Sequence, residues 1–269
     1  MIRVVEPGWS TTVQDGGRHG LAHLGVPPSG TVDPGLAALV NRLVGNDPEA
    51  AVLETAGHLV IEAVRAAIVA VSTAPAPHAL APGQRLRVEP DPDRTWAYLA
   101  VRGGFDTPAV LGSRSTDTLS GIGGTTIVAG SALPVGADPG NPVTVDVAPV
   151  RNPIAVARLW PGPRLDWFVP GAFDALCSTI WTVGAEVSRV GLRLDGGAVL
   201  ERQHHGELPS EGLVRGAVQV PPDGRPVVMS ADHPTTGGYP VLAVVEPDDL
   251  PIVTQQRTGG RIRFVPARR

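Results

Sequence analysis

The sequence predicts a mainly β protein of barrels or sandwiches, divided into two halves. Its 33 glycines and 28 prolines separate short runs of valine, isoleucine and leucine, which is typical of short strands joined by tight turns. The segment Val5-Glu6-Pro7-Gly8 is echoed by Leu159-Trp160-Pro161-Gly162, and further echoes follow in the same order. We therefore expect a weak duplication, with residues 1–150 and 151–269 as two domains.

Strands are expected where short apolar runs are bounded by turn residues. The clearest runs are residues 59–61, 67–71 and 96–101 in the first half and residues 225–230 and 241–245 in the second. One more strand, residues 143–147, lies between two proline-containing segments, which places the domain boundary near residue 150.

Two helices are expected among the strands. Residues 33–44 form the first, because Asp33 can cap it, Pro34 suits its first turn and Gly45 ends it. The second runs from residue 170 or 171 to about residue 180. We expect the rest of the chain to consist of strands and turns.

Composition narrows the classes of function. A net charge of −4 and a pI near 6.0 give no field that attracts nucleic acid or anionic lipid. The single cysteine, Cys177, allows neither an internal disulfide nor a cysteine-based zinc site. Because the start shows no signal-peptide hydrophobic region and no apolar stretch is long enough to span a bilayer, we expect a cytosolic protein and no membrane partner.

Lysine is absent, and every basic residue is an arginine. Without lysine the chain has no Schiff base, no phosphate-loop lysine and no attachment point for covalent biotin. Any nucleotide must therefore be held in another way.

The loop at residues 231–240 is the strongest candidate for ligand binding, because it places Asp232, His233, two threonines and two glycines between apolar runs. Gly237 and Gly238 allow a positive φ and a close backbone approach, while the hydroxyls and amides can meet an anion or a carbonyl. The alternative is a glycine-rich turn whose threonines satisfy their own backbone.

In the first half, Ser29, Gly30 and Asp33 lead into the expected helix. Such a helix start can hold an anion, or Asp33 can simply cap the exposed amides. Asn41, on the helix, can support either role by bonding to a loop.

Two arginines of the first half stand beside glycines and hydroxyls, in Arg102-Gly103 and Arg114-Ser115. Each guanidinium can grip a carboxylate or phosphate in a bidentate manner. The alternative for each is an ion pair with Asp106 or Asp117 that fixes a loop.

In the second half, Glu211 and Asp232 are the carboxylates best placed to act as a base or to hold a metal, since each lies beside hydroxyls at the edge of a strand. Glu211 can instead be buried and bonded to backbone. The histidines at 204 and 205 lack the spacing of a metal-binding helix, so we expect a solvated loop there and no metal site.

Blocks throughout the chain then define a family. They are Thr11-Thr12-Val13-Gln14-Asp15, Gly17-Arg18, Gly25-Val26-Pro27, Ser29-Gly30, Asp33, Asn41, Leu43-Val44-Gly45-Asn46, Arg102-Gly103-Gly104-Phe105, Leu111-Gly112-Ser113-Arg114-Ser115-Thr116, Ser210-Glu211-Gly212, Gly216-Ala217, Gln219-Val220-Pro221, Asp223-Gly224 and Thr235-Thr236-Gly237-Gly238-Tyr239-Pro240. Together they resemble the family called allophanate hydrolase subunit 2, KipA or the C-type subunit of 5-oxoprolinase, which is related to the carboxyltransferase domain of biotin-dependent urea carboxylase.

The resemblance implies two cyclophilin-like β-barrel domains with a few short helices and a site between the domains. It also implies a partner like KipI or the B-type subunit of 5-oxoprolinase, with the A-type subunit as a further partner. Our assignment of roles places Arg102 or Arg114 on a carboxylate and Asp232 or Glu211 toward an amide N–H of a small amide substrate. It places the amides of Gly237 and Gly238 on the carbonyl oxygen. The candidate substrate-binding residues are Ser29, Gly30, Asp33, Asn41, Arg102, Gly103, Arg114, Ser115, Thr235, Thr236, Gly237, Gly238 and Tyr239.

The chain departs from the family pattern at two places. Where relatives often read Asp-Arg-Gln-Thr-Thr-Gly-Gly-Tyr-Pro-Lys, this chain has His233 and Pro234 before the threonines and Val241 after Pro240. Residues 187–194 likewise differ from Ser-Asp/Asn-Arg-Met-Gly-Tyr-Arg-Leu. A lysine and an arginine are thus lost, which implies a changed substrate or reduced activity if either cation bound an anion.

Three functions follow from the resemblance. The leading one is a subunit of an ATP-dependent 5-oxoprolinase, which opens 5-oxoproline to glutamate with the A-type and B-type subunits; the ATP would bind somewhere in the complex. The second is a KipA-type regulatory protein that binds a KipI-like partner. The third is carboxyl transfer to a urea-like amide from biotin carried on another protein.

Overall fold

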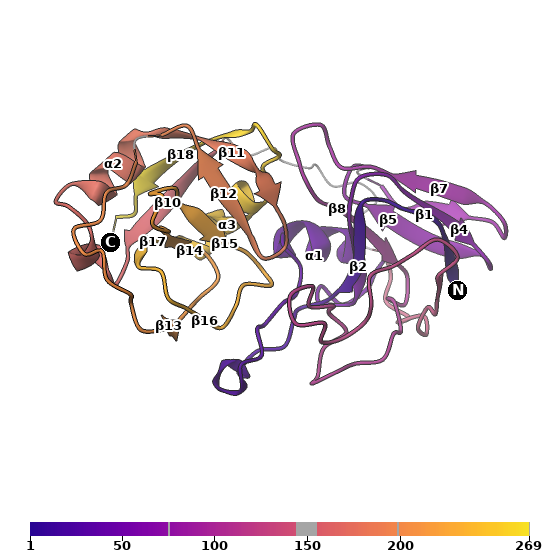
Figure 1. Cartoon of the computed structure of the whole chain (residues 1–269). Coiled ribbons are helices and arrows are strands. Elements are labelled where there is room, and N and C mark those ends of the chain that lie inside the picture. Colours follow the sequence, from indigo (N-terminus) through magenta and orange to yellow (C-terminus); the bar gives the residue numbers. More distant parts are fainter. Residues whose placement is uncertain (75, 144–154, 198, 269) are drawn as a thin grey trace. The chain divides into compact units, whose positions relative to one another are not determined.

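The computed structural model describes residues 1–74, 76–143, 155–197 and 199–268, and within them the chain divides into two compact units. Unit 1 consists of Met1–His19 and Ser29–Asn152, and unit 2 of Gly20–Pro28 and Pro153–Arg269. Both are built mainly of strands (Figure 1), which confirms the predicted fold class. The expected strand at residues 143–147 and the expected boundary near residue 150 fall largely outside the described residues.

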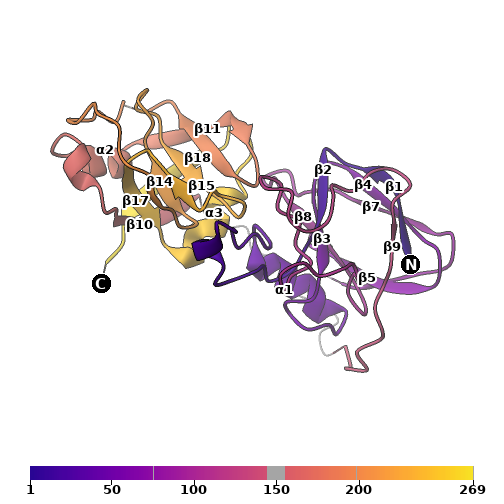
Figure 2. The same cartoon turned by 60° about the horizontal axis from the view of Figure 1, so that its bottom comes forward.

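Unit 1 contains two antiparallel sheets that enclose one core (Figure 2). Alternate residues of each strand point inward, as Ile2 and Val4 do from one sheet and Leu53 and Leu99 from the other. The sheets have the orders β7-β4-β1-β9 and β2-β3-β8-β5-β6. Their strands are β1 (Ile2–Pro7), β2 (Ser10–Gln14), β3 (Val52–Ala56), β4 (Leu59–Ala63), β5 (Ala67–Val71), β6 (His78–Leu80), β7 (Arg85–Val88), β8 (Ala97–Val101) and β9 (Ala132–Leu133).

Helix α1 (Pro34–Leu43) packs against β8 and β5 of unit 1. It begins where the sequence predicts, because the Asp33 Oδ1 accepts a hydrogen bond from the Leu36 amide at 3.0 Å. Gly45, at a φ of 74°, follows its end, as expected for a residue that stops a helix.

Unit 2 contains a closed barrel of seven strands in the order β10-β17-β14-β15-β12-β11-β18. Its interior is filled by large side chains, among them Trp181, Leu159 and Phe264. A separate two-stranded ribbon, β13-β16, lies outside this ladder. The strands are β10 (Val156–Pro161), β11 (Ile180–Val187), β12 (Gly191–Asp195), β13 (Glu211–Gly212), β14 (Ala217–Gln219), β15 (Val227–Met229), β16 (Thr236–Gly237), β17 (Val241–Val245) and β18 (Arg261–Pro266).

Unit 2 also holds short helices. Helix α2 (Ala172–Ser178) matches the second predicted helix and packs on β18 and β17. Helix α3 (Leu250–Thr254) was expected to be strand or turn, and that expectation was wrong. Three 3-10 helices complete the unit: η1 (Ala22–Leu24), η2 (Leu165–Trp167) and η3 (Pro247–Asp249). No helix among the described residues is long and apolar enough to cross a membrane.

Candidate functional site

In unit 1 the polar residues gather around the carboxylate of Asp15, which follows β2. Its Oδ1 accepts hydrogen bonds from the hydroxyls of Ser113 at 2.5 Å and Ser115 at 2.6 Å, and its Oδ2 accepts one from the Arg114 amide at 2.6 Å. Burial by itself would raise the pKa of Asp15, but these bonds and one from the Gly17 amide hold it below its ordinary value. Asp15 is therefore the ionised centre of this cluster, and the sequence analysis had not singled it out.

Ser29 and Gly30 belong to the same cluster. The Thr31 amide donates to the Asp15 carbonyl at 3.2 Å, and a Cβ on Gly30 would come within 3.2 Å of the Gly16 backbone. Ser29 has a φ of 52°, which is unusual for a residue other than glycine. Its hydroxyl oxygen is buried and makes no hydrogen bond to any described residue, so it can bond to a bound group.

The remaining unit 1 candidates have partners within the fold. The Asn41 side chain donates to the carbonyls of Pro48 at 3.2 Å and Ala50 at 2.7 Å, and so fixes the loop after α1. The Gly103 amide donates to Asn46 Oδ1 at 2.8 Å. Asp33 caps α1 and lies 3.5 Å from the Arg94 guanidinium.

The two candidate arginines of unit 1, Arg102 and Arg114, are both paired. Arg102 binds Asp138, with Nη2 to Oδ1 at 2.7 Å, and also donates to the Val44 and Asn141 carbonyls. The Arg114 guanidinium binds Asp106 at 2.8 Å, which is one of the loop-fixing pairs that the sequence left open.

In unit 2 the carboxylate of Asp232 is fully buried and faces Arg189. Arg189 donates from Nε to Oδ2 at 2.8 Å and from Nη2 to Oδ1 at 2.9 Å, a bidentate geometry. The Asp232 amide also donates to the Arg189 carbonyl at 2.8 Å. Asp232 is thus part of a buried ion pair that joins its loop to the end of β11.

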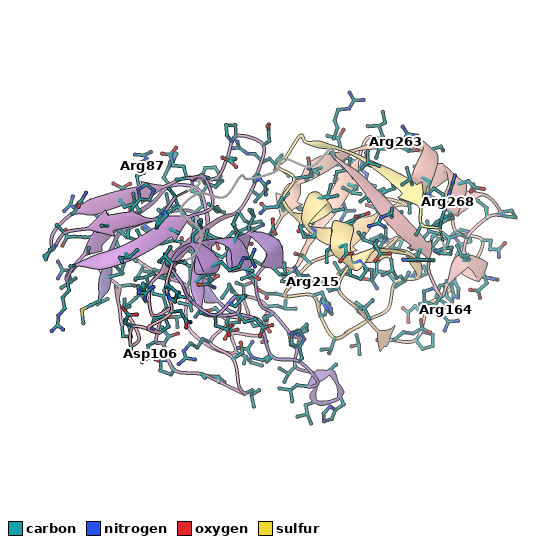
Figure 3. All side chains as sticks on the ribbon, turned by 180° about the vertical axis from the view of Figure 1, so that it is seen from behind. Arg87, Asp106, Arg164, Arg215, Arg263 and Arg268 are labelled. Carbon is teal, nitrogen blue, oxygen red and sulfur yellow. The ribbon has the colours of Figure 1, made fainter. Side chains whose placement is uncertain are left out.

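Glu211 lies on β13 and is held by Arg164, whose Nε donates to Oε2 at 2.9 Å. Arg164 is among the unit 2 side chains labelled in Figure 3. The expected alternative of a buried, backbone-bonded Glu211 was wrong, because its side chain is 31% exposed. The guanidinium holds the pKa of Glu211 below its ordinary value, so the carboxylate is ionised at neutral pH and acts as an acceptor.

The ribbon brings several predicted residues together, since Glu211 pairs with Gly237 and Gly212 with Thr236. Gly237 and Gly238 would allow a positive φ, but neither uses one. Gly237 is small for a different reason: a Cβ there would lie 2.7 Å from Gln219 Nε2 and from Leu213 Cδ1.

The Gln219 side chain in turn fixes the end of the loop. Its Nε2 donates to the Tyr239 carbonyl at 2.9 Å, and the Leu213 amide donates to the Thr235 carbonyl at 2.9 Å. Tyr239 leaves this anchored backbone with a ring that is 47% exposed.

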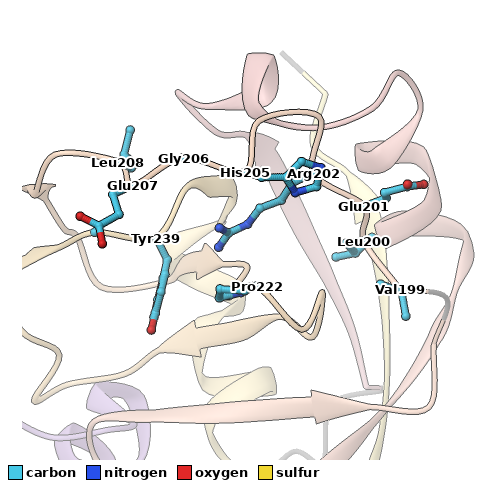
Figure 4. A pocket seen from close by; sticks show the side chains of 11 residues that line it. Val199, Leu200, Glu201, Arg202, His205, Gly206, Glu207, Leu208, Pro222 and Tyr239 are labelled. Atoms are coloured by element: carbon cyan, nitrogen blue, oxygen red, sulfur yellow. The ribbon is translucent and has the colours of Figure 1, made fainter.

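A cavity of about 710 Å³ opens next to Gly238 and Tyr239 (Figure 4), within the range of about 300–1,000 Å³ of small-molecule sites. The Arg202 guanidinium points into it toward Tyr239, with Cζ 5.8 Å from the ring centroid. No pattern in the sequence pointed to Arg202. The other lining residues are Val199, Leu200, Glu201, His205, Gly206, Glu207, Leu208 and Pro222.

The segment beside this cavity is exposed at His204, His205 and Glu207, as expected for a solvated loop. His204 packs edge-on against Trp167, with ring centroids 5.6 Å apart. No group of three or more potential metal ligands occurs among the described residues.

The closed barrel of unit 2 and the two sheets of unit 1 are the fold of a known protein family. Over residues 24–266 the chain matches the family model described as carboxyltransferase domain, subdomain A and B, and the chain belongs to that family. This confirms the resemblance drawn from the sequence blocks.

Three individual proteins are similar to this chain. The chain is 35% identical to the C-type subunit of 5-oxoprolinase from Escherichia coli K12, a match that covers 98% of this chain and 91% of that protein. The crystal structure of TTHA0988 has a TM-score of 0.86 at 37% identity, and covers 98% of this chain and 55% of that one. The urea amidolyase of K. lactis has a TM-score of 0.89 at 28% identity, over 99% of this chain but 19% of that protein.

Proposed function

We propose that the chain belongs to an ATP-dependent 5-oxoprolinase, which opens the amide ring of 5-oxoproline to give glutamate, and that it acts there with the A-type and B-type subunits. One observation carries the proposal: the match to the C-type subunit of the E. coli 5-oxoprolinase extends over 98% of this chain and 91% of that protein. A match of nearly equal length favours the same role in the same kind of complex.

The geometry of unit 2 supports this chemistry. A cyclic amide offers an N–H, a carbonyl oxygen and, in 5-oxoproline, a carboxylate. The ribbon places an ionised acceptor, Glu211, beside the Gly237 backbone, and the adjoining cavity contains a guanidinium. An acceptor for the N–H and a cation for the carboxylate are the groups that such a ligand requires.

Carboxyl transfer is the second candidate, because the fold also matches the K. lactis urea amidolyase and urea carboxylase over 99% of this chain. The biotin would have to be carried by another protein, since the chain has no lysine. Release of label from carboxybiotin, stimulated by an amide acceptor in the absence of ATP, would favour this function.

The test is reconstitution of the chain with its cognate A-type and B-type subunits, followed by measurement of glutamate release from 5-oxoproline and ATP. We expect glutamate only when all three proteins are present, and a lower rate with Glu211→Gln. Glu62→Gln is the matched control, because it makes the same change in a surface ion pair of unit 1 and should leave the rate unchanged. Stable binding to the B-type subunit without turnover would instead favour a regulatory, KipA-type protein.

A further inference from the structure

The cavity in unit 2 contains an arginine that makes no ion pair with any described residue. Arg202 donates from Nε to the Val220 carbonyl at 3.1 Å, and its Nη2 bonds to the same oxygen. Its other contact is the Tyr239 ring, 5.8 Å from Cζ. No described residue accepts a hydrogen bond from Nη1, and the guanidinium points into the cavity (Figure 4).

Arg202 differs in this respect from the arginines around it. Arg164 binds Glu211, Arg189 binds Asp232 and Arg193 binds Asp223. Those three guanidinium groups make direct ion pairs within unit 2, whereas Arg202 makes none with a described residue and interacts with the Asp223 carboxylate only at longer range.

Partial burial strengthens the attraction of the Arg202 charge for an anion. Desolvation lowers the pKa of Arg202 and the Asp223 carboxylate opposes part of that shift, but an arginine remains charged at any physiological pH. A partly dehydrated guanidinium that makes no direct ion pair binds an anion more strongly than an exposed one does.

The walls of the cavity restrict the kind of anion. Glu201 and Glu207 contribute two carboxylates to the lining, and Figure 4 shows the Glu201 side chain pointing away from Arg202. A triphosphate would be repelled by this pair, whereas a ligand with a single carboxylate and an N–H donor is complementary to one guanidinium and nearby acceptors. The half-exposed Tyr239 ring offers a flat face beside the guanidinium for a small planar ring.

We propose that Arg202 binds the carboxylate of a small cyclic amino acid, 5-oxoproline, whose ring lies against Tyr239. The inference rests on the proposed function for the choice of ligand, but it concerns binding to this chain alone and not turnover. It makes Arg202 the residue that distinguishes 5-oxoproline from a neutral lactam.

The test compares two ligands, 5-oxoproline and 2-pyrrolidinone, which has the same ring without the carboxylate. Binding of each to the full chain is followed by NMR or calorimetry without ATP. We expect Arg202→Gln to weaken 5-oxoproline binding by about 10- to 100-fold, the usual loss for a charged hydrogen-bonded contact. Binding of 2-pyrrolidinone should not change, and Arg202→Lys should retain part of the preference for 5-oxoproline.

Arg261→Gln is the control, since it removes an equal charge from an exposed position on β18 and should change neither affinity. Equal weakening of both ligands by Arg202→Gln would show that the residue only supports the loop, and would overturn the inference. Absence of 5-oxoproline binding to the wild-type chain would also overturn it. Arg202-dependent binding without turnover in the reconstituted complex would refute the proposed function and leave the inference standing.

Discussion

Replacement of Asp232 by alanine is expected to destabilise the barrel of unit 2 before it affects any chemistry. The side chains of Arg189 and Asp232 are 1% and 0% exposed, so the variant leaves a guanidinium buried without its counter-ion. Loss of one partner of a buried ion pair costs about 3–5 kcal/mol. The free energy of unfolding of a typical domain is only about 5–15 kcal/mol. A loss of activity in this variant would therefore not identify Asp232 as a base.

Urea denaturation measures the effect. Three of the five tryptophans, Trp160, Trp167 and Trp181, lie in unit 2, so the fluorescence transition includes its unfolding, while Trp9 and Trp96 report on unit 1. The double variant Arg189→Met/Asp232→Leu removes both charges together and should lose much less stability than Asp232→Ala, because no uncompensated charge remains. A single variant that loses less than about 1 kcal/mol, or a double variant as unstable as the single one, would refute the reasoning.

Three further predictions concern other parts of the chain. Ser113→Ala removes a hydrogen bond that lowers the pKa of Asp15. A carboxylate with a lowered pKa stabilises the fold above its unfolded pKa and loses this effect as the pH falls, so acid unfolding of unit 1, followed by circular dichroism, should begin at a higher pH in the variant. An unchanged acid transition would contradict this. Cys177, whose pKa burial raises to about 11, should react with a thiol reagent at pH 8 only after denaturant is added, so rapid labelling of the native chain would argue against its burial. Gly237→Ala should displace Gln219 or Leu213 and destabilise the protein by about 1–3 kcal/mol, measured by urea denaturation. In Gly259→Ala the added Cβ meets no atom within 4 Å, so this variant measures the cost of a positive φ without overpacking.

The elements that the sequence predicted are those fixed by local chemistry. Asp33 and Gly45 mark the two ends of α1, and the strand limits at residues 67–71 and 241–245 agree with β5 and β17. By contrast, the two-residue strands of the ribbon exist only because Glu211 meets Gly237 across a long separation in the chain. No periodicity can be read from two residues, so this pairing could not be predicted.

The partners of charged side chains were also beyond the sequence. Asp106 is eight residues from Arg114, and their ion pair was among the alternatives considered. Asp232 instead pairs with Arg189, which is 43 residues away in the chain. Arg202 was overlooked because its significance is that it makes no direct ion pair with a described residue, which becomes visible only when its neighbours are placed.

The ribbon lies outside the seven-stranded ladder, and this affects which residues of unit 2 can be substituted. Every strand of the barrel is paired on both sides without help from β13 or β16, so the barrel does not depend on them for closure. The exposed residues of segments 201–212 and 235–239 can therefore accept substitutions while the ladder remains intact, provided that Gly237, which lies against Gln219 of β14, is kept. Grafting these two segments from a related chain is accordingly a route to a new ligand preference on an unaltered scaffold.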